Sequence, residues 1–507
     1  MKEFTIKDGV LTKYHGKDTV VKIPDSVTSI GRGAFMDCKN LESVTIPDSV
    51  TSIGRNAFRD CENLESVTLP DSVTSIGRNA FMFCENLESV TVPDSVTYIG
   101  DEAFYYTPWL KNNPDEMVIA GKVLLKYNKE DEKKVKIPDS VTCIADNAFE
   151  CCRFKSITIP DSVTDMTGRA FPDCRSLSNI NVNKNNTALC DVDGVLFSKE
   201  KDVLIRYPIA KAGTAYTIPD SVTSIGSSAF KYCKNLESVT IPDSVTNIGD
   251  AAFYGCGNLK NVMIPNSVTS IGWGAFEYCS KLESVTVPDS VTYIGDEAFN
   301  DTPWLKNNPD EMVIAGKVLL RYNGKERDIT ISEYITGIGN HAFGTMRKLD
   351  SITMYDSVTY VSYWTFLDCK PKTIYIISNG VKYTIDLSIY SEYTFFDKKI
   401  LAFLDFIKNK HFAAPIKPQT KYSIMLDTMI FADEEAAKPY IKKNFVKIMK
   451  WLIDEKDMDR LNTIVENANF ITEQNIDTFI DYAEEKKQRK MFNFFTKYKT
   501  ENFGTAK

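Results

Sequence analysis

Residues of the types that catalyse reactions are few in this chain of 507 residues. It has only three histidines, His15, His341 and His411, and none lies near a Ser or Cys motif that would complete a nucleophile–base pair. The sequence contains no phosphate-binding loop, no dinucleotide fingerprint and no HExxH zinc motif. We therefore expect a protein that is not an enzyme and that uses no cofactor.

Twelve cysteines raise the question of a metal site or of disulfides. No CxxC pair occurs, and nine of the twelve occupy the last position of an AFxxC pattern among apolar neighbours, where a thiol acts as a small hydrophobe. We interpret them as free structural thiols, which fits a reducing compartment. These nine are Cys38, Cys61, Cys84, Cys152, Cys174, Cys233, Cys256, Cys279 and Cys369.

Recurrent aspartates could also hold a metal, since Ca²⁺ prefers oxygen ligands. Each of them directly follows a proline, however, and Pro-Asp is an ordinary turn pair. We favour the turn interpretation and expect no metal. The column consists of Asp25, Asp48, Asp71, Asp94, Asp139, Asp161, Asp220, Asp243 and Asp289.

These residues lie in an internal repeat of about 23 residues. The phrase ESVTIPDSVTSIGRNAF, from Glu42 to Phe58, recurs with few changes, and twelve copies can be aligned along the chain. In each copy two short alternating stretches around a Pro-Asp turn predict two strands, and the apolar spacing of NAFRDCENL predicts one helical turn. Such a unit cannot bury its apolar side chains alone, so the copies must stack.

The repeat resembles the BspA-type leucine-rich repeats, through the pattern L-x-x-V-x-I-P-x-x-V-x-x-I-G-x-x-A-F-x-x-C over about residues 20–370. The resemblance implies an α/β repeat solenoid, right-handed, with one concave parallel β-sheet to which every unit contributes a strand. Many relatives are bacterial or protist surface proteins that adhere to host proteins or cells.

Three longer steps interrupt the 23-residue spacing, and each contains apolar runs around a glycine turn that predict a β-hairpin. We expect a solenoid domain over residues 1–372, with an N-terminal hairpin cap and three hairpin insertions. A capping β-hairpin follows over 373–388, with its turn at Asn379–Gly380, and a helical domain occupies 389–507. Short paired helices there resemble degenerate ankyrin-type pairs but lack the TPLH phrase, and a plain helical bundle explains the same pattern.

One duplication is larger than a single repeat. The 40-residue segments Ser89–Asn128 and Ser284–Asn323 differ at only three positions, where Tyr105, Tyr106 and Lys126 become Asn300, Asp301 and Arg321. The segment either places one surface feature at two points of the array or records a recent gene duplication without a selected role.

Two surfaces are candidates for binding. The first is a uniform Ser/Thr ladder on the first strand of each unit, which suits a repetitive ligand such as a glycan, or no ligand. It consists of Ser43, Thr45, Ser66, Thr68, Ser89, Thr91, Ser238, Thr240, Ser284 and Thr286.

The second candidate surface is aromatic, because the copies vary after the IG dipeptide, between AF and Cys, and in the second strand. Tyr and Trp anchor many protein interfaces. The aromatic candidates are Tyr98, Tyr105, Tyr106, Trp109, Trp273, Tyr293 and Trp304. For Trp109 and Trp304 the alternative is a purely structural role, anchoring their hairpins on the core.

Together these features favour a non-catalytic interaction or adhesion module that binds a protein or a repetitive glycan. Two alternatives are an intracellular scaffold, whose helical domain is a second docking site, and a structural array without a dedicated ligand. The net charge of −8 does not favour nucleic acid. No signal peptide and no apolar stretch of membrane-spanning length is apparent, which predicts a cytoplasmic protein without membrane insertion, whereas the family resemblance favours the cell surface.

Overall fold

The computed structural model describes residues 3–129, 134–344, 346, 348–362, 364–366, 369, 371–387, 396–409, 420–422, 424–425, 438–468 and 470–503. The first residues of the predicted helical domain, from 389, lie outside the described residues. The chain forms two compact units, Met1–Asn308 and Pro309–Lys507.

A single coil shows how the repeat folds. Strand β5 (Ser43–Thr45) turns through Pro47 into β6 (Ser52–Ile53), and the side chains of Val44 and Ile53 are buried inside the coil. The third side, predicted as a helical turn, is a run of hydrogen-bonded turns. Asn56 and Asp60 have φ values of 57° and 60°, and left-handed residues of this kind break a helix.

Neighbouring coils are joined on every side. The Gly54 N–H donates to the Ile30 carbonyl at 2.7 Å, and the Phe58 N–H donates to the Ala80 carbonyl at the same distance. A methyl group added at Gly77 would lie 2.5 Å from the backbone nitrogen of the preceding coil. The glycine of each IG dipeptide is therefore required by the close approach of the coils rather than by its φ angle.

Phenylalanines and cysteines form two buried columns through the stack. Phe35, Phe58 and Phe81 are fully buried, with successive ring centroids 4.9 and 5.2 Å apart and nearly parallel planes. The Cys61 thiol donates to the Phe35 carbonyl one coil back, at 3.1 Å. Every coil thus buries the same contacts as its neighbours, which is how a repeat array is stabilised.

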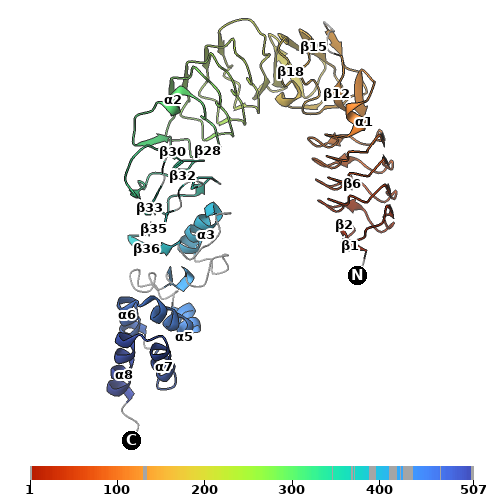
Figure 1. The fold of residues 1–507 in the computed structure, drawn as a ribbon. Helices are drawn as coiled ribbons and strands as arrows, with labels where there is room; N and C mark the ends of the chain where they lie inside the picture. Colours follow the sequence, from red (N-terminus) through yellow and green to blue (C-terminus); the bar gives the residue numbers. More distant parts are fainter. Residues whose placement is uncertain are drawn as a thin grey trace. The chain divides into compact units, whose positions relative to one another are not determined.

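The hairpins divide the array into four blocks (Figure 1), each containing two sheets within the described residues. The predicted hairpins are confirmed, but the single long sheet is wrong, since the parallel first-strand sheet restarts in every block. In block 1 the hairpin's second strand, β2 (Val10–Tyr14), instead begins the second-strand sheet by pairing with β4 (Ser29–Ile30). Block 3 opens with three antiparallel strands rather than a two-stranded hairpin, and the third of them, β20 (Val203–Arg206), begins that sheet. A tyrosine at or directly after the end of the pairing strand also supplies the first ring of the phenylalanine column; Tyr14 lies 5.1 Å from Phe35 and Tyr207 5.3 Å from Phe230.

Blocks 1 to 3 belong to the first unit. Block 1 contains β1 (Phe4–Lys7), β2 (Val10–Tyr14), β3 (Val20–Lys22), β4 (Ser29–Ile30), β5, β6, β7 (Ser66–Thr68), β8 (Ser75–Ile76), β9 (Ser89–Thr91), β10 (Tyr98–Ile99) and helix α1 (Pro108–Lys111). Block 2 contains β11 (Met117–Ala120), β12 (Val123–Tyr127), β13 (Lys134–Lys136), β14 (Cys143–Ile144), β15 (Ser156–Ile159), β16 (Asp165–Met166), a 3₁₀ turn (Gly168–Ala170) and β17 (Asn179–Val182). Block 3 contains β18 (Leu189–Val192), β19 (Val195–Ser198), β20 (Val203–Arg206), β21 (Ala215–Thr217), β22 (Ser224–Ile225), β23 (Ser238–Thr240), β24 (Asn247–Ile248), β25 (Asn261–Met263), β26 (Ser270–Ile271), β27 (Ser284–Thr286), β28 (Tyr293–Ile294) and α2 (Pro303–Lys306).

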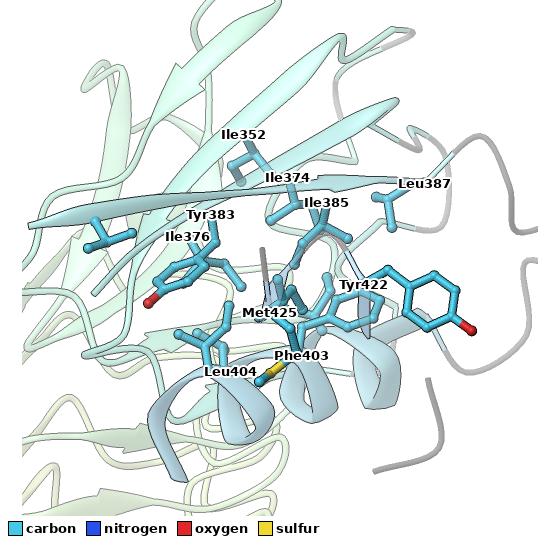
Figure 2. Packing of buried hydrophobic residues seen from close by; sticks show 14 of the residues in the cluster. Ile352, Ile374, Ile376, Tyr383, Ile385, Leu387, Phe403, Leu404, Tyr422 and Met425 are labelled. Atoms are coloured by element: carbon cyan, nitrogen blue, oxygen red, sulfur yellow. The ribbon is translucent and has the colours of Figure 1, made fainter. Parts of the chain in front are cut away.

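The second unit contains block 4 and the helices. Block 4 consists of β29 (Met312–Ala315), β30 (Val318–Tyr322), β31 (Asp328–Thr330), β32 (Gly337–Ile338), β33 (Ser351–Tyr355), β34 (Tyr360–Val361), β35 (Thr373–Ser378) and β36 (Val381–Asp386). The predicted hairpin is β35–β36, and both turn residues, Asn379 and Gly380, have positive φ as a type I′ turn requires. Helix α3 (Phe396–Asn409) packs beside it, with Ile374, Ile385 and Phe403 among the buried side chains between them (Figure 2).

The helices whose bounds lie in the described part of the chain after α3 are α5 (Lys438–Glu455), α6 (Met458–Ala468), α7 (Ile476–Glu485) and α8 (Arg489–Phe503). They contact one another as the pairs α5–α6 and α7–α8, and α5 also contacts α7. Among the helices that the structure describes, none combines the length and the apolar character needed to cross a bilayer.

Candidate functional site

The Ser/Thr ladder lies on the outward face of the first-strand sheets. In block 1, Ser43 pairs with Ser66 and Ser66 with Ser89. In block 3 the ladder is interrupted by Asn261 and by Met263, which is 74% exposed. The ladder is thus a surface feature, but of these two blocks only block 1 carries it without interruption, from Ser43 to Thr91.

The predicted aromatic residues occupy three different environments. Tyr98 and Tyr293 are exposed on the second-strand sheets, in β10 and β28. Trp109 and Trp304 are half-buried and lie edge-on to Phe104 and Phe299, each at 4.8 Å. The tryptophans therefore do pack as anchors on the phenylalanine column, the arrangement that a structural role would need.

Tyr105 and Tyr106 are brought together with a residue that the sequence did not single out. Their rings meet edge-to-face at 4.3 Å, and the Tyr106 ring stacks on Phe83 at 5.0 Å. The guanidinium of Arg59 lies 5.6 Å from the centre of the Phe83 ring. We call Phe83, Tyr105 and Tyr106 the block 1 cluster.

Block 3 carries a second cluster, which we call the tyrosine ladder: Tyr232, Tyr254 and Tyr278. Successive rings meet edge-to-face at 5.5 and 5.3 Å. The ammonium of Lys231 lies 5.5 Å from the Tyr232 ring centre and 5.1 Å from that of Tyr254. Sequence analysis missed these residues, although it located variation between AF and Cys, where all three lie.

The backbone that carries exposed Trp273 lies beside the tyrosine ladder. Its neighbour Gly274 is close to the Tyr254 ring, since a methyl group at Gly274 would lie 3.8 Å from it. Trp273 is 47% exposed and Tyr278 is 48% exposed. Exposed aromatic area on neighbouring turns is typical of a recognition surface.

The environment of the tyrosine ladder is acidic. Glu277 is buried, and burial together with Glu297 and Asp301 raises its pKa to about 7, against the effect of Lys231. The same carboxyl groups raise the pKa of Tyr278, Glu277 contributing most. Glu277 is thus neutral or half-ionised near pH 7, and the carboxylates of Glu297 and Asp301 are close enough to disfavour its charged form.

Four of the cluster aromatics stand at backbone positions that disfavour them. The second residue after AF has positive φ in ten coils of the described part of the chain; five of them place Asp or Gly there, as at Asp37, Asp60 and Gly255, and the other five place Phe, Tyr or Cys. Phe83, Tyr106, Tyr232 and Tyr278 hold the same position with φ between 57° and 62°. A bulky residue in the left-handed region is an outlier that costs of order 1–3 kcal/mol, and such strain collects at functional sites.

The cysteines behave as the sequence predicted. All twelve are thiols outside any disulfide, and eight of the nine AFxxC thiols are buried, Cys38 being half-buried. Burial raises the pKa of Cys84 and Cys279 to about 12, so neither is a reactive thiolate. His15 and His341 lie in different units of the chain, and His411 lies outside the described residues.

Comparison with known proteins decides the family. The family model described as BspA type Leucine rich repeat region (6 copies) matches residues 10–114, 127–192, 212–309 and 320–415. The chain belongs to this family. No curated protein matches the chain. The predicted BspA-type solenoid is confirmed, and leucine-rich-repeat solenoids generally serve as protein-interaction or surface modules.

Solved structures of bacterial leucine-rich-repeat proteins are similar to this BspA-type chain. A leucine rich cell surface protein from Faecalibacterium prausnitzii A2-165 is 28% identical over 74% of this chain and 93% of its own, with a TM-score of 0.35. A leucine-rich repeat protein from Eubacterium ventriosum is 25% identical over 72% and 88%, with a TM-score of 0.34. The pneumococcal vaccine antigen PcpA is 20% identical over 71% and 79%, with a TM-score of 0.28.

Proposed function

We propose that this protein is a non-catalytic interaction module that binds a partner protein through the tyrosine ladder and Trp273 in block 3. The observation that carries the proposal is the exposure of Tyr278 at a left-handed position where half of the described coils place Asp or Gly. A residue that neither fills the core nor suits its backbone conformation is best explained by a contact outside the chain.

The charges around the ladder define the partner. Glu297 and Asp301 raise the pKa of Glu277, so all three carboxyl groups lie within electrostatic reach of one another. An apolar centre with an acidic rim is complementary to a protein surface with an exposed apolar residue surrounded by Lys or Arg. Salt should weaken such a complex mainly by slowing association.

The chain supplies its own replacement residues for the test. Asp301 occupies the repeat position of Tyr278, and Asp250 and Asp296 occupy that of Trp273. The double variant Trp273→Asp/Tyr278→Asp therefore keeps residues that the coil already accepts. We expect it to fold as the wild type does, which circular dichroism and thermal melting would show.

The full-length protein would be immobilised and exposed to protein extracts from its native cell and surroundings. A partner found this way would be purified and its affinity measured by calorimetry for both proteins. We expect the double variant to bind the partner about tenfold or more weakly than the wild type, as truncation of interface anchors does. Equal affinity of the wild type and the double variant would overturn the proposal.

A second docking site, on the helices, has support of its own. In the second unit, Phe445, Val446 and Phe470 line a groove together with Lys442, Lys443 and Lys447. Val446 is exposed, and the three lysines would attract an acidic segment. Val446→Ser with Lys447→Ser should abolish such binding without affecting the ladder's partner, which would identify the protein as a scaffold with two docking sites.

Location remains a separate part of the proposal. A partner outside the cell requires exposure at the surface, whereas the sequence predicts a cytoplasmic protein. Protease treatment of intact native cells, followed by detection of the untagged protein, distinguishes these settings. Loss of the protein from intact cells would favour adhesion, and its protection would favour an intracellular scaffold.

A further inference from the structure

A cavity of about 300 Å³ lies in the first unit, where block 1 ends and block 2 begins. The last coil of block 1 supplies one wall, helix α1 and strand β12 supply two more, and the block 2 coil at 145–150 closes the site. Nine of the twelve coils have glycine at the IG position, and most of these glycines leave no room for a methyl group against the preceding coil. The block 2 coil has Ala145 at that position, and both Ala145 and Gly100 line the cavity.

One wall of the cavity is aromatic. Tyr105 and Tyr106 both line it and are held edge-to-face at 4.3 Å, with Tyr106 supported from behind by the stacked ring of Phe83. Tyr106 is 59% exposed at φ 59°, so neither core packing nor its backbone conformation accounts for its presence. Aromatic rings held in this way offer a flat apolar face to a ligand.

The other walls present hydrogen-bond acceptors in a fixed arrangement. Asp101 and Asp146 line the cavity and are joined by Arg169, whose guanidinium lies 3.5 Å from the Asp101 carboxylate and 2.7 Å from that of Asp146. The Thr167 hydroxyl also donates to Asp146. The carboxylate positions are therefore set before any ligand arrives, which reduces the entropy cost of binding.

Donors complete the lining. Lys111 from α1 and Lys126 from β12 reach the cavity, together with Asn147. An anionic ligand would meet the carboxylates of Asp101 and Asp146, and a cationic ligand would meet the two ammonium groups. A neutral ligand whose groups both donate and accept hydrogen bonds satisfies the whole set.

The duplicated segment points to the same cavity. Thirteen of the 40 positions in Ser89–Asn128 line it, and the three positions that differ from Ser284–Asn323 are all among the thirteen: Tyr105, Tyr106 and Lys126. Three differences scattered at random would seldom all fall on cavity positions. The rest of the segment is unchanged, so the changes concentrate where a ligand would touch.

We propose that this cavity binds a single sugar ring, with one apolar face of the ring on Tyr105 and Tyr106 and its hydroxyl groups on Asp101, Lys111 and Lys126. Hydroxyl groups both donate and accept, and the C–H face of a pyranose is apolar, so this ligand class matches both the mixed polar lining and the aromatic wall. Ligand pockets begin at about this volume. The inference rests on the proposed interaction function, because it assigns a second ligand to the same non-catalytic module.

The test uses the full chain and a panel of methyl glycosides: glucoside, galactoside, mannoside, fucoside and N-acetylglucosaminide. Binding is observed by saturation-transfer NMR at about 10 mM, a concentration that detects weak millimolar complexes. The variant is Tyr105→Asn/Tyr106→Asp, the pair that the other segment carries, so folding is expected to be retained. Tyr98→Ser, the serine of the corresponding strands at Ser52 and Ser75, is the matched control away from the cavity.

We expect at least one glycoside to bind, with the transfer strongest at the protons of one ring face. Binding should fall about tenfold or more in the double variant and be unchanged in Tyr98→Ser. Absence of binding across the panel, or equal binding in the double variant, would overturn the inference. A glycan array then separates the sources: array binding that the free glycoside inhibits indicates a terminal sugar of a glycan, and glycoside binding without array binding indicates a free sugar.

Failure here can be told apart from failure of the proposed function. The cavity variant leaves Trp273 and Tyr278 intact, so it should keep the affinity for the partner protein. The Trp273→Asp/Tyr278→Asp variant should likewise keep sugar binding, since neither residue lines the cavity.

Discussion

Glu277 should make the stability of block 3 depend on pH. It is 7% exposed, and its pKa is raised to about 7 by burial and by Glu297 and Asp301, from an ordinary value of 4.5. The folded coil therefore holds a proton that the unfolded chain has lost between these two values. Stability is highest below pH 4.5, falls as the pH rises through this window, and is lowest above about pH 7.

The size of the effect follows from the shift. Each pKa unit corresponds to about 1.4 kcal/mol, so the full shift would correspond to about 3 kcal/mol. Asp301 is exposed and Glu297 is half-buried, so water and salt screen part of their repulsion of Glu277, and we expect a loss of about 1–2 kcal/mol. The loss should be larger at low ionic strength, because the repulsive part of the shift is then less screened.

Hydrogen exchange of the peptide 273–282, followed by mass spectrometry at pH 5 and pH 8.5, measures this local stability in the full chain. Comparing the wild type with Glu277→Gln at each pH cancels the intrinsic pH dependence of exchange. We expect Glu277→Gln to match the wild type at pH 5 and to be more protected at pH 8.5. Glu150, which is exposed at the same repeat position, provides the control Glu150→Gln, which should leave this peptide unchanged.

The reasoning would be refuted if Glu277→Gln lost protection between pH 5 and pH 8.5 to the same extent as the wild type. That result would mean that Glu277 ionises in the folded coil as easily as in water, or that water reaches it. A loss of wild-type protection at pH 8.5 that appears only at high salt would also contradict the prediction, since salt can only reduce the repulsion among the carboxylates.

Three further outcomes are expected. Phe58→Ala should lower the free energy of unfolding of block 1 by about 3–5 kcal/mol in urea, because it leaves a cavity between the rings of Phe35 and Phe81. Thr45→Ala, at an exposed position, should change the same free energy by less than about 0.5 kcal/mol. Thr107→Ala should speed hydrogen exchange over 108–111 and lower the free energy of unfolding by about 1–2 kcal/mol. The reason is that the buried Thr107 hydroxyl donates to the Phe104 carbonyl at 2.7 Å and also caps α1. The control Thr107→Ser keeps the hydroxyl and should retain most of the protection. Cys151, the one exposed thiol, should react first with a thiol reagent, and Cys151→Ser should remove that fast phase; fast labelling of other thiols in the folded protein would contradict their burial.

Most of the fold could be predicted because the coil is a local structure. The alternation of Val44 and Ile46, the Pro47 turn and the core-facing Cys61 all act within one 23-residue unit, so the sequence specifies strands, turn and free thiols directly. The hairpins could be predicted for the same reason, as at Asn379–Gly380. The third side was predicted less well for two reasons. The spacing of Phe58 and Cys61 is compatible with a helix, and the residue types Asn and Asp do not by themselves indicate the left-handed φ values found at Asn56 and Asp60.

The candidate sites could be predicted only in part. Variation between copies indicated that the positions after AF are free to change, which includes Tyr105 and Tyr106, but it did not show which rings meet. Tyr232, Tyr254 and Tyr278 stand at two different repeat positions, so no single column of the aligned repeats contains them. Trp109 illustrates the opposite case, since its aromatic character was recognised and its packing against Phe104 was visible only in the structure.

By itself the sequence determined the repeating coil, its buried columns and the hairpins that break the spacing, because these depend on side chains close together in the chain. The tertiary structure decided how far each sheet extends, which aromatic rings touch and where a cavity remains. The physical reason is that stacking is set between coils: a hairpin ends one block's sheet, begins another, and separates two coils by enough space for Asp101, Asp146 and Tyr105 to face one cavity.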